Sequence, residues 1–570
     1  MPTVSHPPGF QGDFHTHPAA RAAYSEGAGP YRIVPDAIAI PRDIDDLSLL
    51  VKFAGGEGHA LVPRGAGSGM PGGNVGRGIL VDLHRFRSPL RVSIDARANT
   101  GAAVSWGLIN SAAKRIKHRL PPDPSSGAYC TIGGMVATNA GGARSLRYGS
   151  MRRWVEGVEF VTADGEVGWL ARNGRSRRHA RPRPKRGQRR KLEEHLAVDD
   201  RFDSDAKPVL LGQRATITDR FPNTTKNSSG YALDEYLKSG DLLDLVIGSE
   251  GTLGFITRVE TRLDSEPVST ASMLLTLADV DELGDVVQTL LRLEPSVVEL
   301  LDRTFLEIAA EPHFLRGGVD AVLLVEFERS NAAAVRGVVG DAVRQTTPWC
   351  TEVETALTAE ERKRLWSLRH AASPRLAELP ANRRSLQIVE DGCVPVESLS
   401  RYLKGVREAA RIAGVEIVAF GHAGDGHLHV NALVDTHDPS FENRIVDLLQ
   451  MVTDLIVELK GSVSGEHGDG RLRASLLERT YGSDITALFR LVKKAFDPEG
   501  ILNPGVILPS PDSRPTDNLK VGKRAVTIPP AISDGLLAIE RRGRWGAPKL
   551  ELCEHEGPAK PQPPITKSGS

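Results

Sequence analysis

The stretch PRGAGSGMPGG, residues 63–73, decides how the N-terminal half of the chain is interpreted. Its string G-S-G-M-P-G fits the dinucleotide fingerprint G-x-G-x-x-G, which has meaning only between a strand and the start of a helix. Here more glycines follow, and then ILVDL (residues 79–83), which is typical of a short buried strand. The pattern is therefore only a weak indication of a nicotinamide-dinucleotide site. Two interpretations stay open: a phosphate cradle of backbone N–H groups, or an ordinary glycine-rich turn.

Length and composition limit the classes of protein. A chain of 570 residues is expected to form two or more domains, and 72 basic against 72 acidic residues give no bias toward nucleic acid or membranes. The four cysteines are scattered without a C-x-x-C pair, which argues against an iron–sulfur cluster. The first residues lack the regions of a signal peptide, and no apolar run is long enough to span a membrane. We expect a soluble, cytoplasmic protein.

The texture of the sequence changes along the chain. Residues 1–30 are a polar lead-in that we expect to be loosely packed, and residues 31–265 alternate short apolar runs with glycine-rich turns, as in the hairpin pattern VEGVEFVTADGEV. Residues 266–508 contain longer segments with helical periodicity, including ADVDELGDVVQTLLRLEPSVVELLD and LTAEERKRLWSLRHAASPRLAEL, and β-like runs such as AVLLVEFE. The tail, residues 509–570, is rich in Pro, Lys and Arg and is predicted to be disordered.

A basic block interrupts the first of these regions. Residues 172–191 hold eleven Lys or Arg in twenty positions. Such a block is usually a disordered surface loop, and this is the prediction. An anionic partner such as nucleic acid is the alternative, although no aromatic residues are interleaved to stack on bases.

Three further glycine-rich pieces join the opening loop: PPDPSSGAYCTIGGMVATNAGG (residues 121–142), KNSSGYAL (residues 226–233) and IGSEGTLGFITRV (residues 247–259). Together they resemble the FAD-binding domain of the vanillyl-alcohol-oxidase and p-cresol-methylhydroxylase (VAO/PCMH) fold. The resemblance implies an α+β architecture with a PCMH-type FAD-binding domain over residues 31–265. An α/β substrate (cap) domain with a C-terminal FAD-linked-oxidase segment would follow over residues 266–508.

The same resemblance assigns cofactor residues. The pyrophosphate would be wrapped by main-chain donors of Arg64, Gly65, Ala66, Gly67, Ser68 and Gly69. The flavin and ribityl chain would be lined by Asp123, Ser126, Thr131, Gly133, Gly134, Asn139, Gly141 and Gly142, with Gly251 and Ile256 near the other end of the cofactor. Relatives that bind flavin covalently often have a histidine in the first loop. Ala66 and Ser68 stand at the comparable places here, so noncovalent FAD is expected.

Two histidine-containing motifs mark the C-terminal half. VAFGHAGDGHLHVN (residues 418–431) is typical of two strands joined by a turn, with His427, His429 and Asn431 on one face of the second strand and His422 at the end of the first. SGEHGDGRLR (residues 464–473) adds adjacent acid and imidazole groups. Two histidines and a carboxylate leave coordination positions open, as in catalytic zinc sites. The alternative is that these are polar residues in glycine-rich surface turns.

The two motifs resemble those of the FAD-dependent D-2-hydroxyacid dehydrogenases, over about residues 31–508 through the closing FDPEGILNPG. The resemblance implies that His422, His429 and Glu466 hold a divalent metal, expected to be zinc, and that His467 is the catalytic base. In WSLRHAAS, Arg369 and Ser373 fall where the D-2-hydroxyglutarate enzymes hold substrate carboxylates. His427 departs from the asparagine frequent at its position, which leaves open which imidazoles hold the metal.

The function implied is oxidation of a D-2-hydroxyacid (D-2-hydroxyglutarate, D-lactate or glycolate) to the 2-oxoacid, by hydride transfer to flavin. GEHGDGR resembles most the large bacterial enzymes that join this flavoprotein to an iron–sulfur region, but this chain has no cysteine set for such a region. Two alternatives stay open: a separate acceptor, such as an iron–sulfur polypeptide or a quinone-linked carrier, takes the electrons, or the chain is a shortened relative of those enzymes. The alternatives are a flavin oxidase that uses oxygen, or a non-catalytic flavoprotein or nucleic-acid-associated protein with the basic loop as its interaction surface.

Overall fold

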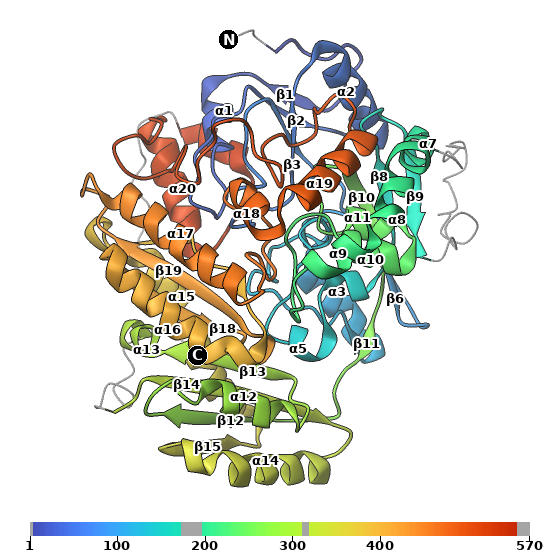
Figure 1. The fold of residues 1–570 in the computed structure, drawn as a ribbon. Coiled ribbons are helices and arrows are strands. Elements are labelled where there is room, and N and C mark those ends of the chain that lie inside the picture. Colours follow the sequence, from blue (N-terminus) through green and yellow to red (C-terminus); the bar gives the residue numbers. More distant parts are fainter. Residues whose placement is uncertain (1–3, 173–195, 310–317, 556–570) are drawn as a thin grey trace.

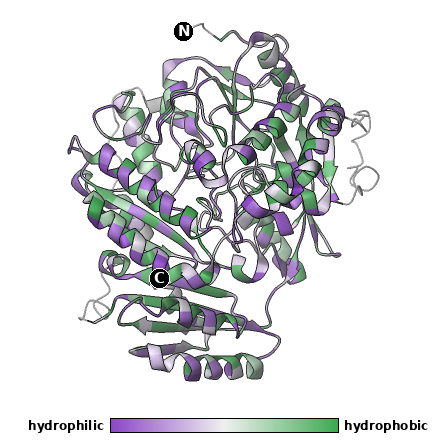
Figure 2. Cartoon of the chain, in the orientation of Figure 1, coloured by the Kyte–Doolittle hydropathy of each residue, from purple (hydrophilic) through white to green (hydrophobic). Residues whose placement is uncertain are grey.

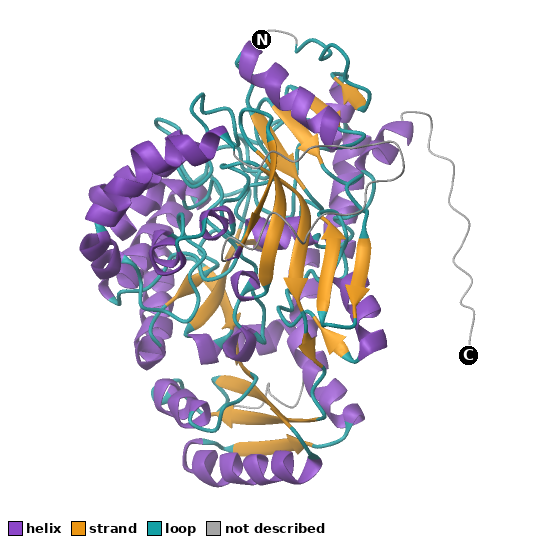
Figure 3. Ribbon diagram, turned by 90° about the vertical axis from the view of Figure 1, so that its right-hand side faces the viewer, coloured by secondary structure: helices purple, strands orange, loops and turns teal. Residues whose placement is uncertain are grey.

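The computed structural model describes residues 4–172, 196–309 and 318–555, and within them the strands form three larger sheets and one small one (Figure 1). Apart from Arg172, the basic block lies outside the described residues. Seen from the side, the strands form the middle of the molecule and the helices lie around them (Figure 3). Within the described ranges, no helix is both long enough and apolar enough to cross a membrane.

The first sheet positions the glycine loop. Its order is β1-β2-β4-β3, with β1 (Asp13–His15), β2 (Ala37–Ile40), β3 (Leu61–Arg64) and β4 (Ile79–Asp82). β3 and β4 are parallel neighbours, so the loop of residues 65–78 leaves at the carboxyl end of β3 and returns to the start of β4. Helix α2 (Ile44–Glu57) connects β2 to β3 and is capped by the Asp43 side chain. The expected sequence of strand, glycine loop and strand is confirmed.

The lead-in is not loosely packed. Strand β1 pairs with β2, and helix α1 (Pro18–Ala23) buries four of its alanines. The expectation for residues 1–30 is therefore wrong over its described part, because Phe10 and the alanines between prolines and histidines bury enough apolar surface to order the segment.

The second sheet is antiparallel, in the order β5-β6-β10-β8-β9. Its strands are β5 (Leu90–Ser93), β6 (Arg97–Gly101), β8 (Val155–Val161), β9 (Val167–Ala171) and β10 (Phe255–Arg262). The predicted hairpin is confirmed as β8–β9. β7 (His118–Arg119) and β11 (Asp264–Ser265) pair separately.

Short helices pack around the second sheet. They are α3 (Trp106–Ala113), α4 (Ile132–Ala137), α5 (Ser145–Tyr148), α7 (Ala197–Arg201), α8 (Lys207–Gly212), α9 (Arg214–Arg220), α10 (Leu233–Ser239) and α11 (Leu242–Val246). From near the other end of the chain, α18 (Leu477–Tyr481) and α19 (Ser483–Phe496) return to this core. The core of the second sheet is thus completed by a distant segment.

The third sheet has eight strands in the order β15-β12-β14-β13-β18-β19-β16, with β17 (Gly392–Cys393) pairing β19. The strands are β12 (Ser269–Leu277), β13 (Val297–Asp302), β14 (Ala321–Arg329), β15 (Glu352–Ala356), β16 (Arg384–Leu386), β18 (Glu416–Gly421) and β19 (His427–Val434). In Figure 2 these strands are largely hydrophobic and the helices over them mix both colours.

Helices cover both faces of the third sheet. Those whose side chains join its larger core are α12 (Leu283–Leu291), α14 (Ala332–Thr346), α16 (Leu399–Ala413) and α17 (Phe441–Glu458). On the other face lie α13 (Arg303–Ala309) and α15 (Ala359–Glu378). The helical expectation for ADVDELGDVVQTLLRLEPSVVELLD is wrong in its second half. Its last six residues form β13, and all of them are buried because both faces of the strand are covered, which removes the two-residue alternation.

The tail is ordered over residues 509–555. Helix α20 (Pro530–Arg542) and the 3₁₀ segment η10 (Lys549–His555) pack against α1, as Figure 1 shows. The prediction of disorder is wrong here because Ile532, Leu536 and Ile539 recur at helical spacing and bury their side chains. Residues 556–570 lie outside the described residues.

Candidate active site

A cavity of about 550 Å³ lies between the glycine-rich loops and the third sheet. Most of the predicted cofactor residues line it: Arg64, Gly65, Ala66, Gly67, Ser68, Gly69, Ser126, Thr131, Gly133, Gly134, Gly141, Gly251 and Ile256. Residues of the substrate half, including Phe420, Asn431, Glu466 and His467, line it as well. One cavity therefore joins the predicted cofactor site to the histidine motifs.

The glycine loop has the properties of a dinucleotide cradle. Within the described residues, the backbone N–H groups of Ala66, Gly67 and Ser68 donate no hydrogen bond to the protein, so they are available to an anion. A Cβ on Gly65 would lie 2.5 Å from Thr131 Oγ1, so the Thr131 side chain packs directly against the Gly65 backbone. The Arg64 guanidinium donates to the Tyr24 and Glu26 carbonyls, at 3.1 and 2.7 Å. These residues fit FAD.

Three predicted cofactor residues, Asp123, Asn139 and Gly142, do not line the cavity. Asp123 accepts from the Arg144 guanidinium at 2.6 Å, and the Asn139 side chain accepts from the backbone N–H of Arg152 at 2.9 Å. The Gly142 carbonyl accepts from Lys226 Nζ at 3.1 Å. In this arrangement they hold the shape of the loop, and direct contact of any of them with FAD stays a prediction.

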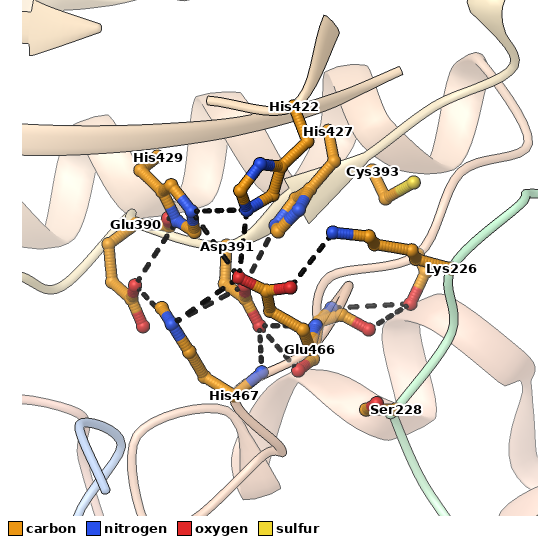
Figure 4. Close-up of polar contacts among 12 residues, drawn as sticks. Lys226, Ser228, Glu390, Asp391, Cys393, His422, His427, His429, Glu466 and His467 are labelled. Carbon is orange, nitrogen blue, oxygen red and sulfur yellow. Dashed lines mark hydrogen bonds and ion pairs between the residues drawn. The ribbon is translucent and has the colours of Figure 1, made fainter. Parts of the chain in front are cut away.

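The histidine motifs bring three predicted metal ligands together (Figure 4). His422 follows β18, His429 lies on β19 and Glu466 lies in the loop before η9 (Ala474–Leu476). His422 Nε2 lies 3.1 Å from Glu466 Oε1 and 3.4 Å from His429 Nε2, and His429 Nε2 lies 3.5 Å from the same carboxylate oxygen. Three buried ligand atoms thus converge on one point, which fits a divalent ion with open coordination positions.

Charged partners orient these ligands. His422 Nδ1 binds Glu299, which also accepts from Arg369 Nε at 2.7 Å, and Lys226 Nζ lies 2.8 Å from Glu466 Oε2. Burial penalises charge, yet Lys226 holds the pKa of Glu466 well below its usual range and Glu299 raises the pKa of His422 to about 9. A divalent ion would therefore displace a proton from His422 on binding.

His427 stands beside the cluster. Its Nε2 lies 2.8 Å from Asp391 Oδ1, and its Nδ1 has no hydrogen-bond partner among the described residues. Burial lowers its pKa to about 3, so the ring is neutral, as a ligand imidazole must be. It lies close enough to His422, His429 and Glu466 to be a fourth candidate ligand.

His467 reaches from the cluster into the cavity wall, with 27% of its side chain exposed. Its Nδ1 lies 2.6 Å from Glu390 Oε2, and its backbone N–H donates to Asp391 at 2.9 Å. Although burial penalises the charged ring, Glu390 and Asp391 raise its pKa to about 10. The hydrogen bond at Nδ1 leaves Nε2 as the ring atom that can exchange a proton with a bound molecule.

The predicted substrate residues are placed differently. Arg369 pairs with Glu299 and lies over the Phe420 ring, 4.9 Å from Cζ to the ring centre, and it is not part of the cavity wall. Ser373 lies in helix α15, but its side chain is outside what the structure describes. Their contact with a substrate carboxylate stays a prediction.

Four residues of the site were not singled out from the sequence: Lys226, Glu299, Glu390 and Asp391. The sequence offers a weak signal for the last two, which are adjacent carboxylates directly after the apolar run LQIV. Lys226 begins the glycine-rich piece KNSSGYAL. Glu299 lies inside an apolar run, where an acidic residue requires a buried partner.

Comparison with known proteins agrees with this arrangement. Residues 35–171 match the family described as FAD binding domain, and residues 266–507 match FAD linked oxidases, C-terminal domain. The chain is 29% identical to the glycolate oxidase subunit GlcD of Bacillus subtilis, covering 86% of this chain and 93% of that one. It is 29% identical to a D-lactate dehydrogenase of Archaeoglobus fulgidus, covering 85% and 95%. For the D-2-hydroxyglutarate dehydrogenase of Escherichia coli the identity is 28%, over 88% of this chain and 51% of that longer protein.

Solved structures share the fold. The 4-ethylphenol oxidase of Gulosibacter chungangensis superposes with a TM-score of 0.59 at 15% identity, covering 86% of this chain and 92% of that one. An alkyldihydroxyacetonephosphate synthase gives a TM-score of 0.57 at 15% identity, covering 86% and 83%. At this identity the likeness concerns the fold alone.

Proposed function

Since the chain belongs to the FAD-linked oxidoreductases of the D-lactate, glycolate and D-2-hydroxyglutarate dehydrogenase type, we propose that it oxidises a D-2-hydroxyacid to the 2-oxoacid with noncovalent FAD and a divalent metal, zinc. One observation carries this proposal. The ligand atoms of His422, His429 and Glu466 converge beside His467, at the wall of the same cavity that the glycine loops line.

The chain's own residues define the proton path. His467 Nε2 accepts the α-hydroxyl proton, and Glu390, bound to Nδ1, fixes the ring and stabilises the imidazolium that forms. The ring must be neutral before it accepts this proton, and positive charge at the neighbouring ligand cluster favours the neutral ring. When bound, a divalent ion would polarise the substrate hydroxyl and FAD would accept the hydride.

Among the candidate substrates, D-2-hydroxyglutarate carries a second carboxylate that D-lactate and glycolate lack. Arg369 and Ser373, as matched from the family motif, support a substrate with this group. For the electron acceptor we propose a separate iron–sulfur polypeptide or a quinone-linked carrier. A flavin oxidase that passes electrons to oxygen is the second candidate, and the rate of reoxidation of reduced flavin by oxygen separates the two.

The test is an anaerobic visible spectrum of purified, metal-replete protein titrated with D-2-hydroxyglutarate, D-lactate, glycolate and the L-isomers. We expect one of the two D-acids or the achiral glycolate to bleach the flavin bands, chelation to abolish bleaching while the flavin stays bound, and added Zn²⁺ to restore it. The His422→Ala variant should retain flavin but lose metal by elemental analysis. A flavin spectrum that none of these acids bleaches would remove the substrate class, and a colourless protein that cannot be loaded with FAD would remove the cofactor.

A further inference from the structure

The tail helix forms part of the cofactor cavity. Residues 540–543 and Trp545 line it, although they lie beyond residue 507, where the matched C-terminal domain ends. Trp545 is buried, and the ammonium groups of Lys520 and Lys549 lie 5.9 and 5.3 Å from the centre of its ring. The end of α20 is therefore fixed in place at the cavity.

This end of the tail adjoins the glycine cradle through one loop. Ideal Cβ positions on Gly543 and Gly546 would lie 3.9 and 3.4 Å from Tyr129. Tyr129 belongs to the loop that ends at Thr131, whose side chain packs against the Gly65 backbone. Arg541 and Arg542, directly before Gly543, line the same cavity as the cradle.

The cradle itself supplies no free positive charge. The FAD pyrophosphate carries two negative charges, and backbone N–H groups satisfy its hydrogen bonds without neutralising it. Among the described residues of the wall, five side chains can be cationic. Arg64 is committed to two backbone carbonyls, Arg384 pairs with Glu540 at 3.0 Å, and His467 pairs with Glu390.

The remaining two are Arg541 and Arg542, at the end of α20. Both are exposed, and neither makes a hydrogen bond or ion pair with another described residue. Glu540, the acidic neighbour, is already neutralised by Arg384 and by Lys520 at 3.1 Å. We propose that Arg541 and Arg542 bind the FAD pyrophosphate and neutralise it, so that the tail is a cofactor-binding element. This rests on the FAD-binding part of the proposed function.

The test measures FAD affinity directly. Apoprotein is titrated with FAD, following quenching of flavin fluorescence, for the wild type, the double variant Arg541→Gln/Arg542→Gln and the control Arg544→Gln. Arg544 is exposed on the same segment but does not line the cavity. Each lost charge-assisted contact is worth about tenfold in Kd, so the double variant should weaken FAD about 100-fold, and its Kd should depend less on salt. The control should stay within about twofold.

The outcomes separate the two proposals. A wild-type protein that binds no FAD overturns the proposed function. If the wild type and the double variant bind FAD equally well, only the proposed role of the tail is overturned. The same holds if the double variant differs from the wild type only in needing a higher hydroxyacid concentration for half-saturation. Equal thermal unfolding midpoints of the three apoproteins exclude a folding defect, because both exchanged side chains are exposed.

Discussion

Among the clustered histidines His422, His427, His429 and His467, only His467 is more than one-tenth exposed. The other three rings are buried and bound to acidic side chains or to one another. A proton can therefore pass between the cluster and a molecule in the cavity through His467, whereas the other rings are placed to hold a cation.

The His467→Ala variant should keep its FAD but lose turnover by about 10²–10⁴-fold, because the proton acceptor is removed while the glycine cradle is untouched. The measurement is the anaerobic rate of flavin reduction, together with the flavin-to-protein absorbance ratio. His437→Ala is the control, since His437 is an exposed imidazole bonded to Asp435 and does not line the cavity. An unchanged reduction rate in His467→Ala would remove the assignment.

The residues of the cluster differ in how far the sequence could predict them. His422, His429 and Glu466 were predictable because two glycine–acid–glycine turns and a two-residue alternation mark them locally. Glu299 was not predictable, because it meets His422 across 123 positions of sequence and its own neighbourhood is an ordinary apolar strand. Contacts of this kind depend on which strands are neighbours in the sheet, and the local sequence pattern does not contain that information.

At the scale of elements, a turn beside the cavity uses backbone in the left-handed region, which favours glycine. Gly251 has φ +71°, and an ideal Cβ there would lie 2.2 Å from Pro63 Cγ, at the start of the glycine cradle. The backbone of the turn before β10 therefore packs directly against the Pro63 ring at the end of β3. A methyl group on residue 251 would push the turn away from β3, because the Pro63 ring that it meets is rigid and is not the flexible end of a side chain.

Gly251→Ala should lower the stability of the apoprotein by about 2 kcal/mol and weaken FAD at least tenfold, because of strained backbone and a displaced cradle. Gly56→Ala is the matched control: Gly56 lies in α2 with nothing within 4 Å of its ideal Cβ, so alanine should raise stability by about 0.5–1 kcal/mol. Denaturant unfolding and FAD titration measure the two effects. Equal FAD affinities would show that the turn does not shape the cradle.

The elements also show where prediction from composition fails. Overall Pro, Lys and Arg content predicted a disordered tail, yet three apolar residues at helical spacing order α20 against α1. Similarly, the helical periodicity of residues 278–302 predicted a helix that extended over residues 297–302, which form β13. The apolar run of β13 is too short for its periodicity to distinguish a helix from a strand. Hairpin β8–β9 was predictable, since its turn residues and alternation are local.

At the scale of the whole molecule, ion pairs join the FAD-binding part to the third sheet. Arg144 binds Asp123 at 2.6 Å and Glu326, on β14, at 2.7 Å. Arg119 binds Glu328, also on β14, at 2.9 Å, and the Tyr148 hydroxyl donates to the same carboxylate. The proposed reaction requires the flavin and the histidine cluster to keep a fixed separation, and these contacts hold the cradle side against β14.

Glu328→Gln should therefore destabilise the protein as a whole. Its carboxylate is 3% exposed, and removing its charge leaves Arg119 without its buried partner, which costs about 3 kcal/mol. Glu416→Gln is the control on the same sheet, because the pair of Glu416 with Arg383 is about half exposed and should change stability by less than about 0.5 kcal/mol. Urea unfolding followed by tryptophan fluorescence gives both midpoints. A Glu328→Gln midpoint equal to that of the control would mean that the Arg119–Glu328 pair does not help to hold the two parts together, and flavin reduction rates should then be equal as well.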